Sequence, residues 1–231
     1  GVPTLTADFA ATQSLGFGQL GFRIASPYDM YKEYFTIMSY DDQWQGGFNA
    51  YTPMILDVIA LQEAYGEGAG TTGASDDTIV AGTVGYRTYF DRGGVDMIAL
   101  DLYTEGAYLN MGVQISGAPH LVGIAMSLSD ATTTITYGGD PQHLRWFYGE
   151  YENARGGSFN DVLIGNVLPN VIYGQSGDDS ISGKGGNDTL FGGTGIDTAY
   201  YDGAKGRYQF VQSGTAWTIS DSGGIDGSDT L

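Results

Sequence analysis

The chain has 231 residues, with 27 acidic and nine basic side chains, a net charge of −18 and no cysteine. Such an acidic chain lacks the basic surface that nucleic acid requires, and without cysteine it forms no disulfide or zinc–thiolate site. No apolar run approaches the roughly 18 residues of a membrane-spanning helix. We therefore expect a folded chain with no nucleic-acid partner and no transmembrane segment.

Most of the acidic residues are aspartates. Asp accounts for 21 of the 27, and the chain also has 38 glycines. Asp is a poor helix former, and both residue types are favoured in turns. The composition therefore indicates many turns, and an acidic chain of this size either repels itself or holds cations.

One helix is clear in the first third of the chain, at residues 52–66. A threonine that suits the N-cap precedes a proline at the first helical position. Apolar residues then follow at helical spacing, and Gly66 ends the segment. A Gly-rich stretch follows and indicates a linker. We therefore predict two domains, at residues 1–66 and 67–231, with the second mainly β.

From Asp76 onward the pattern changes to short strands, which are β-branched or aromatic and bounded by Gly, Asp or Thr. The predicted strands lie at residues 77–82, 86–90, 96–103, 107–115 and 132–139. Near the end of the chain, residues 207–220 predict a terminal antiparallel β-hairpin about a Ser-Gly turn.

Between these segments, glycine and aspartate recur with a period of nine. Five repeats, named nonads 1 to 5, follow one another without a gap from residue 156 to residue 200. They occupy residues 156–164, 165–173, 174–182, 183–191 and 192–200. Position 1 of every nonad is Gly, position 6 is Asp or Asn, and position 8 is apolar. Asp202 and Gly203 leave the period, so we expect the repeat structure to end there.

The spacing matches the G-G-x-G-x-D-x-U-x pattern of a calcium-binding parallel β-roll. Each nonad would form a six-residue turn, with glycine where φ is positive, and a three-residue strand that points position 8 inward. The turns would aim backbone carbonyls and one carboxylate at a shared point, and such oxygens are ligands for Ca²⁺. The candidate metal-binding residues are Gly156, Gly174, Gly183, Gly192, Asp161, Asn170, Asp179, Asp188 and Asp197.

Two nonads would complete one coil, so turns on the same edge would belong to alternate nonads. Asp161, Asp179 and Asp197 would line the first edge, and Asn170 and Asp188 the second edge, with each ion bridging neighbouring turns. A flexible Gly-rich linker is the alternative, but it gives no reason for apolar residues at a fixed phase through five repeats. Nonad 1 has Phe at position 4, and nonad 2 has Leu, Pro and Asn at positions 4 to 6. We expect the site of nonad 2 to be weak or incomplete.

Residues 1–66 narrow the interpretation. The segments "YFTIMSYDDQWQGG" and "YTPMILDVIALQEAYG" resemble the stretch after the zinc helix of serralysin-type metallopeptidases, a metzincin family whose Met-turn would fall at Met38-Ser39-Tyr40. The resemblance continues through "DRGGVD", "YENARGG" and the nonads. It implies a remnant of the catalytic domain with one helix in residues 1–66. It also implies a calcium-binding RTX β-roll within a β-sandwich-like domain in residues 67–231.

By this resemblance, Met38 would form an apolar floor below the zinc, and Tyr40 would ligate the metal or stabilise the tetrahedral intermediate. The family's H-E-x-x-H-x-x-G-x-x-H motif is missing, because the chain has only two histidines, His120 and His143, and they lack the H-x-x-x-H spacing. Zinc catalysis needs about three protein ligands and a base. We therefore expect the chain to be inactive alone, with Zn²⁺ only in a parent protein that has the motif upstream.

The same family implies more calcium near residues 91–96. The sequence "DRGGVD" is similar to a loop that binds two calcium ions at the head of the family's β domain. The residues implied for the two ions are Asp91, Gly93, Gly94, Asp96, Ala74, Asp76, Thr78, Glu150 and Glu152. A β-turn with exposed acids is the alternative. Two carboxylates five positions apart, with glycines between them, favour a hard oxygen site.

Three functions remain open at this point. The first is the calcium-binding C-terminal part of a secreted serralysin-like zinc metalloendopeptidase, which acts on protein substrates and associates with its own N-terminal catalytic part. The second is a non-catalytic extracellular RTX protein with a structural, adhesive or surface-assembly role. The third is a module of another enzyme, such as a lipase or polysaccharide epimerase, which the Met-turn and helix argue against. The family implies type I secretion, so we expect an extracellular or cell-surface location.

Overall fold

The computed structural model describes residues 58, 75–82, 87–114, 120–129, 144–224 and 226–231. These residues fall into two compact units. The first unit comprises the described parts of Gly1–Ala74, Thr83–Arg92 and Gly112–Glu150, and the second those of Ser75–Gly82, Gly93–Met111 and Tyr151–Leu231. The predicted helix at residues 52–66, apart from Val58, and the predicted strand at 132–139 lie outside the described residues.

Strands dominate both units, so the chain is mainly β as predicted. They are β1 (Thr78–Val80), β2 (Arg87–Phe90), β3 (Met97–Ala99), β4 (Ala107–Gln114), β5 (Leu121–Ser127), β6 (Arg145–Tyr148), β7 (Asn153–Arg155), β8 (Val162–Ile164), β9 (Val171–Ser176), β10 (Ser180–Ser182), β11 (Thr189–Thr194), β12 (Thr198–Ala199), β13 (Tyr208–Ser213), β14 (Ala216–Asp221) and β15 (Ser228–Thr230). A short 3₁₀ helix, η3, spans Lys205–Arg207. Within the described residues, no helix has the length and apolarity needed to cross a bilayer.

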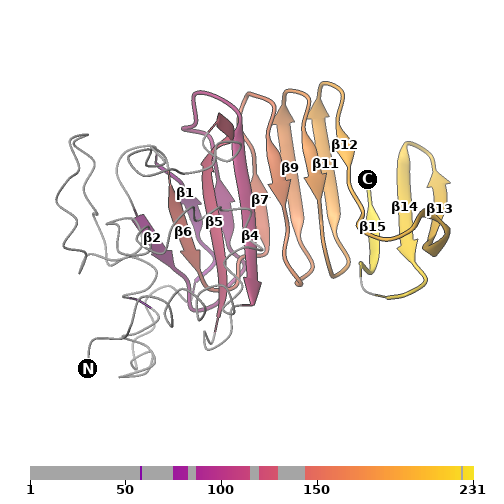
Figure 1. The fold of residues 1–231 in the computed structure, drawn as a ribbon, viewed down its shortest axis with the longest axis horizontal. Helices are drawn as coiled ribbons and strands as arrows, with labels where there is room; N and C mark the ends of the chain where they lie inside the picture. Colours follow the sequence, from indigo (N-terminus) through magenta and orange to yellow (C-terminus); the bar gives the residue numbers. More distant parts are fainter. Residues whose placement is uncertain (1–57, 59–74, 83–86, 115–119, 130–143, 225) are drawn as a thin grey trace, which may run out of the picture. The chain divides into compact units, whose positions relative to one another are not determined.

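In the second unit the chain winds into a coil of parallel strands (Figure 1). On one face, β8, β10 and β12 stack in register, with Leu163 beside Ile181 and Ile181 beside Ala199. On the other face, β7, β9 and β11 stack in the same way, with Ile172 beside Leu190. Each nonad pairs with the next but one, so two nonads make one coil. The predicted β-roll is confirmed.

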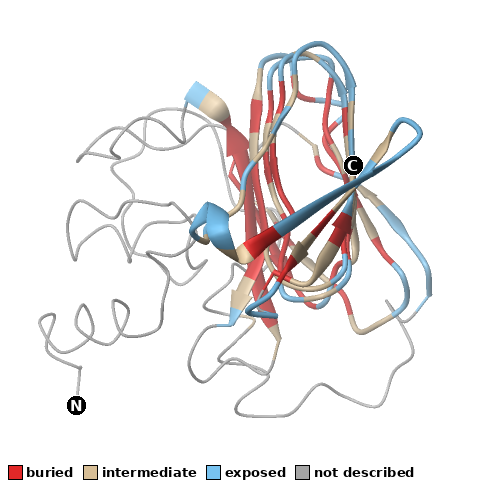
Figure 2. Cartoon of the chain, turned by 90° about the vertical axis from the view of Figure 1, so that its right-hand side faces the viewer, coloured by how far each residue is buried: buried red, intermediate tan, exposed pale blue. Residues whose placement is uncertain are grey.

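Side chains at position 8 fill the interior of the roll. Leu163 and Ile172 are fully buried, and Ile181 and Leu190 are at most 4% exposed, because successive residues of a strand point to opposite faces. Figure 2 shows buried residues along the strands and exposed residues at the bends. Burial falls towards the last coil, where Ala199 is half-buried. Position 8 therefore buries less apolar surface in the last coil than in the earlier ones.

The first unit contains β2, β5 and β6. β5 pairs antiparallel with β6, and β2 pairs parallel with β6. Every residue of β5 and β6 is buried. Sequence analysis missed both strands, because a strand buried on both faces lacks the alternation that marks a half-buried strand. His120 lies edge-on to Tyr148, with ring centroids 5.3 Å apart, so this histidine packs among aromatic rings; His143 lies outside the described residues.

The end of the chain corrects one expectation. β13 and β14 form the predicted antiparallel hairpin, with Gly214 in the turn at φ 66°. The repeat structure does not end at Asp202, however. β15 adds a further parallel strand beside β11, where Thr189 pairs with Thr230, and it pairs antiparallel with β14 on its other side. The nine-residue period could not reveal this strand, because η3 and the hairpin intervene.

Candidate metal centre

The position-6 side chains of the first edge form a continuous ladder. The backbone N–H of Asp161 donates to Oδ1 of Asp179 at 2.8 Å, and the N–H of Asp179 donates to Oδ1 of Asp197 at 3.0 Å. The ladder also extends back to β4, because the N–H of Ala107 donates to Oδ1 of Asp161 at 2.7 Å. The coiling of alternate nonads thus brings together the three aspartates that the sequence placed on this edge.

The second edge repeats the arrangement. The N–H of Asn170 donates to Oδ1 of Asp188 at 2.8 Å. These two residues are buried, as are Asp161 and Asp179 of the first edge, whereas Asp197 in the last turn is half-buried. The hydrogen bonds between neighbouring turns therefore use only Oδ1 of each accepting carboxylate, so Oδ2 needs a separate partner.

Position 1 must be glycine, because neighbouring oxygens lie where a Cβ would be. A Cβ on Gly174 would lie within 3.0 Å of two oxygens, Oδ2 of Asp179 and the carbonyl of Gly192. The same steric conflict with the position-6 side chain of the same nonad occurs at Gly156, Gly165, Gly183 and Gly192. A carboxylate oxygen and a carbonyl oxygen therefore converge beside the bare glycine, and this is the donor set that Ca²⁺ prefers.

Positive φ angles lie elsewhere in the turn, at positions 2 and 4. At position 4, the values are 121° for Gly177, 112° for Gly186 and 139° for Gly195. At position 2, Gln175 and Lys184 adopt 81° and 70°, which is uncommon for residues with side chains. The predicted need for glycine at positive φ thus applies to position 4 of nonads 3 to 5, and position 1 is glycine for space.

Two buried carboxylate oxygens on these edges have no hydrogen-bond partner among the described residues: Oδ2 of Asp179 and Oδ2 of Asp188. Burial raises the pKa of Asp179 to about 6 and that of Asp188 to about 7. Both shifts show that the fold disfavours the ionised carboxylates as they stand. A bound cation would supply the missing partner and favour ionisation, so the residues present fit calcium.

In nonads 1 and 2, the corresponding side-chain oxygen at position 6 does have a hydrogen-bond donor. Oδ2 of Asp161 accepts a hydrogen bond from the N–H of Gly157 at 2.6 Å, and Oδ1 of Asn170 accepts one from the N–H of Asn166 at 2.9 Å. The Asn170 amide also donates to the carbonyl of Glu152 at 3.0 Å. Protein donors therefore occupy the oxygens that face no donor in nonads 3 and 4.

The loop at residues 91–96 brings part of its predicted site together within the second unit. Oδ1 of Asp96 accepts from the N–H of Asp77 at 2.7 Å, and the N–H of Asp96 donates to Glu152 at 2.8 Å. The N–H of Val95 donates to Oδ1 of Asp76 at 2.9 Å. Hydrogen bonds to backbone N–H groups thus tie Asp76 and Glu152 to this loop and Asp96 to the segment before β1.

The glycines of this loop fit the same picture. Gly93 and Gly94 have φ angles of 129° and 131°, and a Cβ on Gly94 would lie 2.6 Å from the carbonyl of Ser75. Thr78 begins β1 and pairs with Met97. Of the remaining residues of the prediction, Asp91 and Glu150 belong to the first unit and Ala74 lies outside the described residues.

Neither zinc candidate can be placed, because Met38 and Tyr40 lie outside the described residues. Within the described part of the chain, no group of three or more His, Cys, Asp or Glu side chains is gathered in a way that could hold a metal ion. At position 6 the roll instead presents one side chain per turn, a carboxylate in nonads 1, 3, 4 and 5 and the amide of Asn170 in nonad 2. A cation there would take most of its ligands from backbone carbonyls, which hard cations such as Ca²⁺ accept.

Sequence reasoning missed one residue of this kind, Asp229 in β15. Its Oδ1 accepts from the N–H of Asp188 at 3.0 Å, and its Oδ2 is buried without a hydrogen-bond partner in the described structure. Burial is the largest cause that raises its pKa. The available signal was the string "GIDGSDTL" at residues 224–231, which places Gly and Asp at nonad spacing but out of phase with nonads 1 to 5.

Comparison with curated proteins finds no match for this chain. Comparison with protein families finds one match within it, at residues 168–199, which run from nonad 2 through nonad 5. Repeats of this family bind Ca²⁺ and are characteristic of secreted or extracellular proteins. Residues 168–199 thus match the RTX calcium-binding nonapeptide repeat, in four copies.

Proposed function

We propose that the chain is the calcium-binding C-terminal portion of a secreted serralysin-like zinc metalloendopeptidase. Its β-roll would fold on extracellular Ca²⁺ and so support type I secretion and the stability of the protein. The observation that carries the calcium part is the pair of buried carboxylate oxygens on Asp179 and Asp188, which lack hydrogen-bond partners among the described residues.

The roll couples folding to calcium through charge. The chain carries a net charge of −18, and the ladders stack aspartates directly above one another. The Asp179 carboxylate, for example, accepts a hydrogen bond from the N–H of Asp161, and the N–H of Asp179 donates to the carboxylate of Asp197. Each Ca²⁺ would neutralise two charges and link neighbouring turns, so that binding free energy becomes folding free energy.

The difference in calcium concentration between the cytosol and the exterior would couple folding of the roll to secretion. Extracellular calcium modules have dissociation constants of about 10⁻⁴ to 10⁻³ M. A roll in this affinity class stays unfolded in the cytosol and folds after export. This order suits passage through a type I channel, which the serralysin resemblance implies.

The peptidase part rests on the resemblance around the Met-turn and the helix at residues 52–66. Met38 and Tyr40 would lie below and beside a zinc ion whose H-E-x-x-H ligands are not among residues 1–231. The chain's own contribution would then be the floor and one polar group of the active site, together with the roll. Peptide hydrolysis would require the zinc-binding part of the same protein.

A second function is favoured by one observation, the lack of the zinc motif in a chain that otherwise resembles the family. In this case the protein is a non-catalytic extracellular RTX protein with a structural, adhesive or surface-assembly role. The calcium-dependent folding is the same in both cases.

Far-UV circular dichroism of the chain, with millimolar Ca²⁺ and with excess chelator, tests the calcium proposal. Strand content should fall in chelator, with the loss centred on nonads 3 to 5, and return when Ca²⁺ is restored, and an unchanged spectrum would refute it. A casein-cleavage assay of the complete gene product, with and without a zinc chelator, separates the two functions. Zinc-dependent cleavage supports the peptidase, and absence of cleavage in a calcium-folded, zinc-supplemented protein supports the non-catalytic alternative.

A further inference from the structure

The last strand of the chain takes the place of the next repeat on the second edge. The N–H of Asp188 donates to Oδ1 of Asp229 at 3.0 Å, as the N–H of Asn170 donates to Oδ1 of Asp188 at 2.8 Å. The N–H of Thr230 then donates to the carbonyl of Asp188 at 2.9 Å, as the N–H of Thr189 does to Asn170 at 2.8 Å. Asp229 therefore stands at position 6 of a further turn.

The residues before Asp229 agree with this assignment. The N–H of Ser228 donates to Oδ1 of Asn187 at 2.9 Å, which matches the bond from Ile196 to Asp178 between position-5 residues of the first edge, at 2.8 Å. A Cβ on Gly227 would lie within 3.0 Å of the carbonyl of Gly186. The position-4 glycines Gly195 and Gly177 show the same close approach. Gly227, Ser228 and Asp229 thus occupy positions 4, 5 and 6.

The chain separation explains why this repeat escapes detection by period. Asp188 and Asp229 are 41 residues apart, whereas Asn170 and Asp188 are 18 residues apart. The extra length of chain holds the connection after nonad 5, η3 and the β13–β14 hairpin. The family match ends at residue 199 and does not reach this segment. Residues 226–231 are therefore a detached sixth repeat that returns to the roll.

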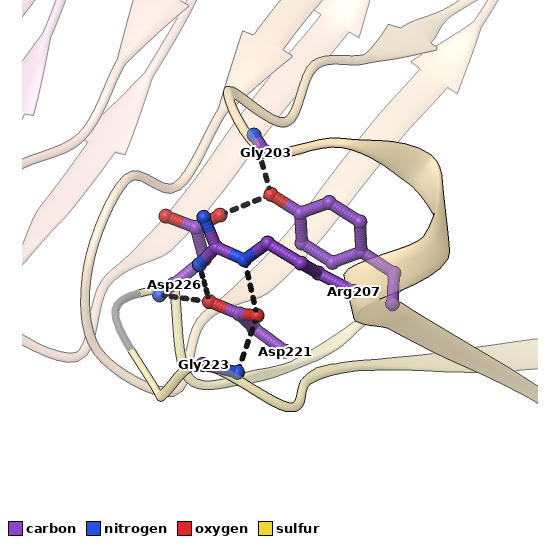
Figure 3. A network of polar contacts seen from close by, with 6 residues as sticks. Gly203, Arg207, Asp221, Gly223 and Asp226 are labelled. Atoms are coloured by element: carbon purple, nitrogen blue, oxygen red, sulfur yellow. Dashed lines mark hydrogen bonds and ion pairs between the residues drawn. The ribbon is translucent and has the colours of Figure 1, made fainter.

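A separate polar network fixes the return of the chain (Figure 3). The Arg207 guanidinium forms an ion pair with the buried Asp221 carboxylate, and its Nε donates to Oδ1 of Asp221 at 3.1 Å. The Tyr208 hydroxyl donates to Asp226 and accepts from the N–H of Gly203 at 2.7 Å. The network joins the start of the hairpin to the residue three places before Asp229, so the sixth repeat is held in register.

The two carboxylates that face each other here both lack a partner for one oxygen. Asp188 is 2% exposed and Asp229 is 1% exposed; Oδ2 of Asp188 has no hydrogen bond to any described residue, and Oδ2 of Asp229 has none of regular geometry, although the Tyr201 hydroxyl interacts with this carboxylate. The hydroxyl of Tyr201 lies close to the Asp229 carboxylate. Two buried acids, one step apart on an edge whose other member is the neutral Asn170, supply the only pair of position-6 carboxylates among the described residues of the second edge.

We infer that Asp188 and Asp229 together hold a further calcium ion, and that residues 226–231 act as the detached sixth repeat that completes this site. The inference rests on the proposed calcium-binding function of the roll and adds the segment after the hairpin to it.

Isothermal titration of the complete chain with Ca²⁺ tests the inference by stoichiometry. The variant Asp229→Asn keeps an oxygen that can accept from the N–H of Asp188 but removes the charge. The matched control is Asp202→Asn, because Asp202 is an exposed acid that pairs with Lys184 and changes the net charge equally. Asp229→Asn should bind one ion fewer than the control, Asp188→Asn should lose the same ion, and the double variant should lose no more.

The outcomes separate the inference from the function beneath it. If the unmodified chain binds no Ca²⁺, the proposed function fails. If the chain binds Ca²⁺ but Asp229→Asn keeps the full stoichiometry, or if the double variant loses two ions, the inference alone is overturned.

Terbium luminescence provides a second readout that does not remove a ligand. Tyr201 is beside Asp229, so it should sensitise Tb³⁺ bound between Asp188 and Asp229. Tyr201→Phe should therefore reduce tyrosine-sensitised emission more than Tyr200→Phe, which alters the neighbouring exposed tyrosine. Equal emission from both variants would contradict a site at this position, even if Asp229→Asn proves unable to fold.

Discussion

Nonads 1 and 2 and nonads 3 to 5 share one coil but treat the position-6 side chain differently. In the first pair, a backbone N–H of the same turn fills the oxygen of Asp161 or Asn170. In nonads 3 and 4, the corresponding oxygens of Asp179 and Asp188 are buried and have no donor among the described residues. In the first two turns a backbone donor thus satisfies the position-6 side chain, whereas nonads 3 and 4 leave a carboxylate oxygen that a bound cation would satisfy.

The difference originates in the backbone at positions 2 and 4. Nonads 1 and 2 carry Phe159 and Leu168 at position 4, and side chains of this size disfavour positive φ. Among the described residues, positive φ at positions 2 and 4 occurs in nonads 3 to 5 only. Without it, the N–H of position 2 turns towards the position-6 side chain. Positive φ at positions 2 and 4 thus accompanies the turns in which Asp179 and Asp188 have a carboxylate oxygen without a backbone donor.

Removing calcium should have the largest effect and should divide the roll along this line. In excess chelator, nonads 3 to 5 should lose their hydrogen-exchange protection, because each site near saturation at 100 times its dissociation constant contributes about 2.7 kcal/mol. Nonads 1 and 2 should keep more of theirs. Hydrogen exchange followed by mass spectrometry of peptides from the two halves measures this, and uniform loss across 156–200 would break the comparison.

A glycine substitution should sharpen the role of space at position 1. Gly174→Ala places a Cβ within 3.0 Å of Asp179 Oδ2 and of the Gly192 carbonyl, whereas the nearest atom to a Cβ on Gly157 is 3.5 Å away. Overpacking of this kind costs about 1–3 kcal/mol, and it also displaces two calcium-facing oxygens. Thermal unfolding in Ca²⁺ should show a large loss for Gly174→Ala and little change for Gly157→Ala; similar losses would mean that position 1 does not shape the site.

The extent of sequence prediction follows the same division. The nonads could be read because glycine, aspartate and an apolar residue recur at fixed positions, and the ladder between alternate nonads followed from that period. Asp229 could not be selected, since its partner Asp188 is 41 residues away along the chain. The unpaired oxygens were also beyond the sequence, because the path of the position-2 N–H depends on backbone angles that residue type only biases.

The strands of the first unit show a different limit. β5 and β6 are buried throughout, so they carry no alternation, and periodicity cannot separate such strands from other apolar runs. The exposed and half-exposed strands of the second unit, such as β13 and β14, were predicted from their turn and alternation. The two strands buried along their whole length, β5 and β6, were therefore the ones that strand periodicity could not identify in the first unit.

Charge removal should distinguish the two kinds of turn. Asp179→Asn should weaken calcium binding about tenfold or more while leaving the stability of the chelated chain unchanged or higher, since a buried, unpartnered carboxylate is unfavourable without a cation. Asn170→Ala should instead lower the stability of the chain without weakening calcium binding. It removes the hydrogen bond to Glu152 and should cost about 1 kcal/mol in Ca²⁺ and in chelator alike. Calcium titration and chemical denaturation under both conditions compare the variants, and a calcium-independent loss for Asp179→Asn would contradict the assignment.

We also expect a pH dependence of stability and of calcium affinity, with opposite signs in the absence and in the presence of calcium. Burial raises the folded-state pKa of Asp179 to about 6 and of Asp188 to about 7, above the ordinary value of 3.8. Between pH 3.8 and about pH 6 to 7, these two side chains bind more protons in the calcium-free folded chain than in the unfolded chain. Its stability should therefore be highest at low pH and fall as the pH rises through about 6 to 7.

With calcium present, protons and the cation compete for the same oxygens, so apparent affinity should fall as the pH drops below about 7. Thermal unfolding in chelator and calcium titration, each measured from pH 5 to pH 8, give the two slopes. Nonads 1 and 2 should contribute less to this reversal. Burial also raises the pKa of Asp161, but hydrogen bonds from the N–H groups of Ala107 and Gly157 counteract the rise, and position 6 of nonad 2 is an amide that does not titrate. A reversal that persists in the Asp179→Asn, Asp188→Asn double variant would place the titrating groups outside nonads 3 and 4.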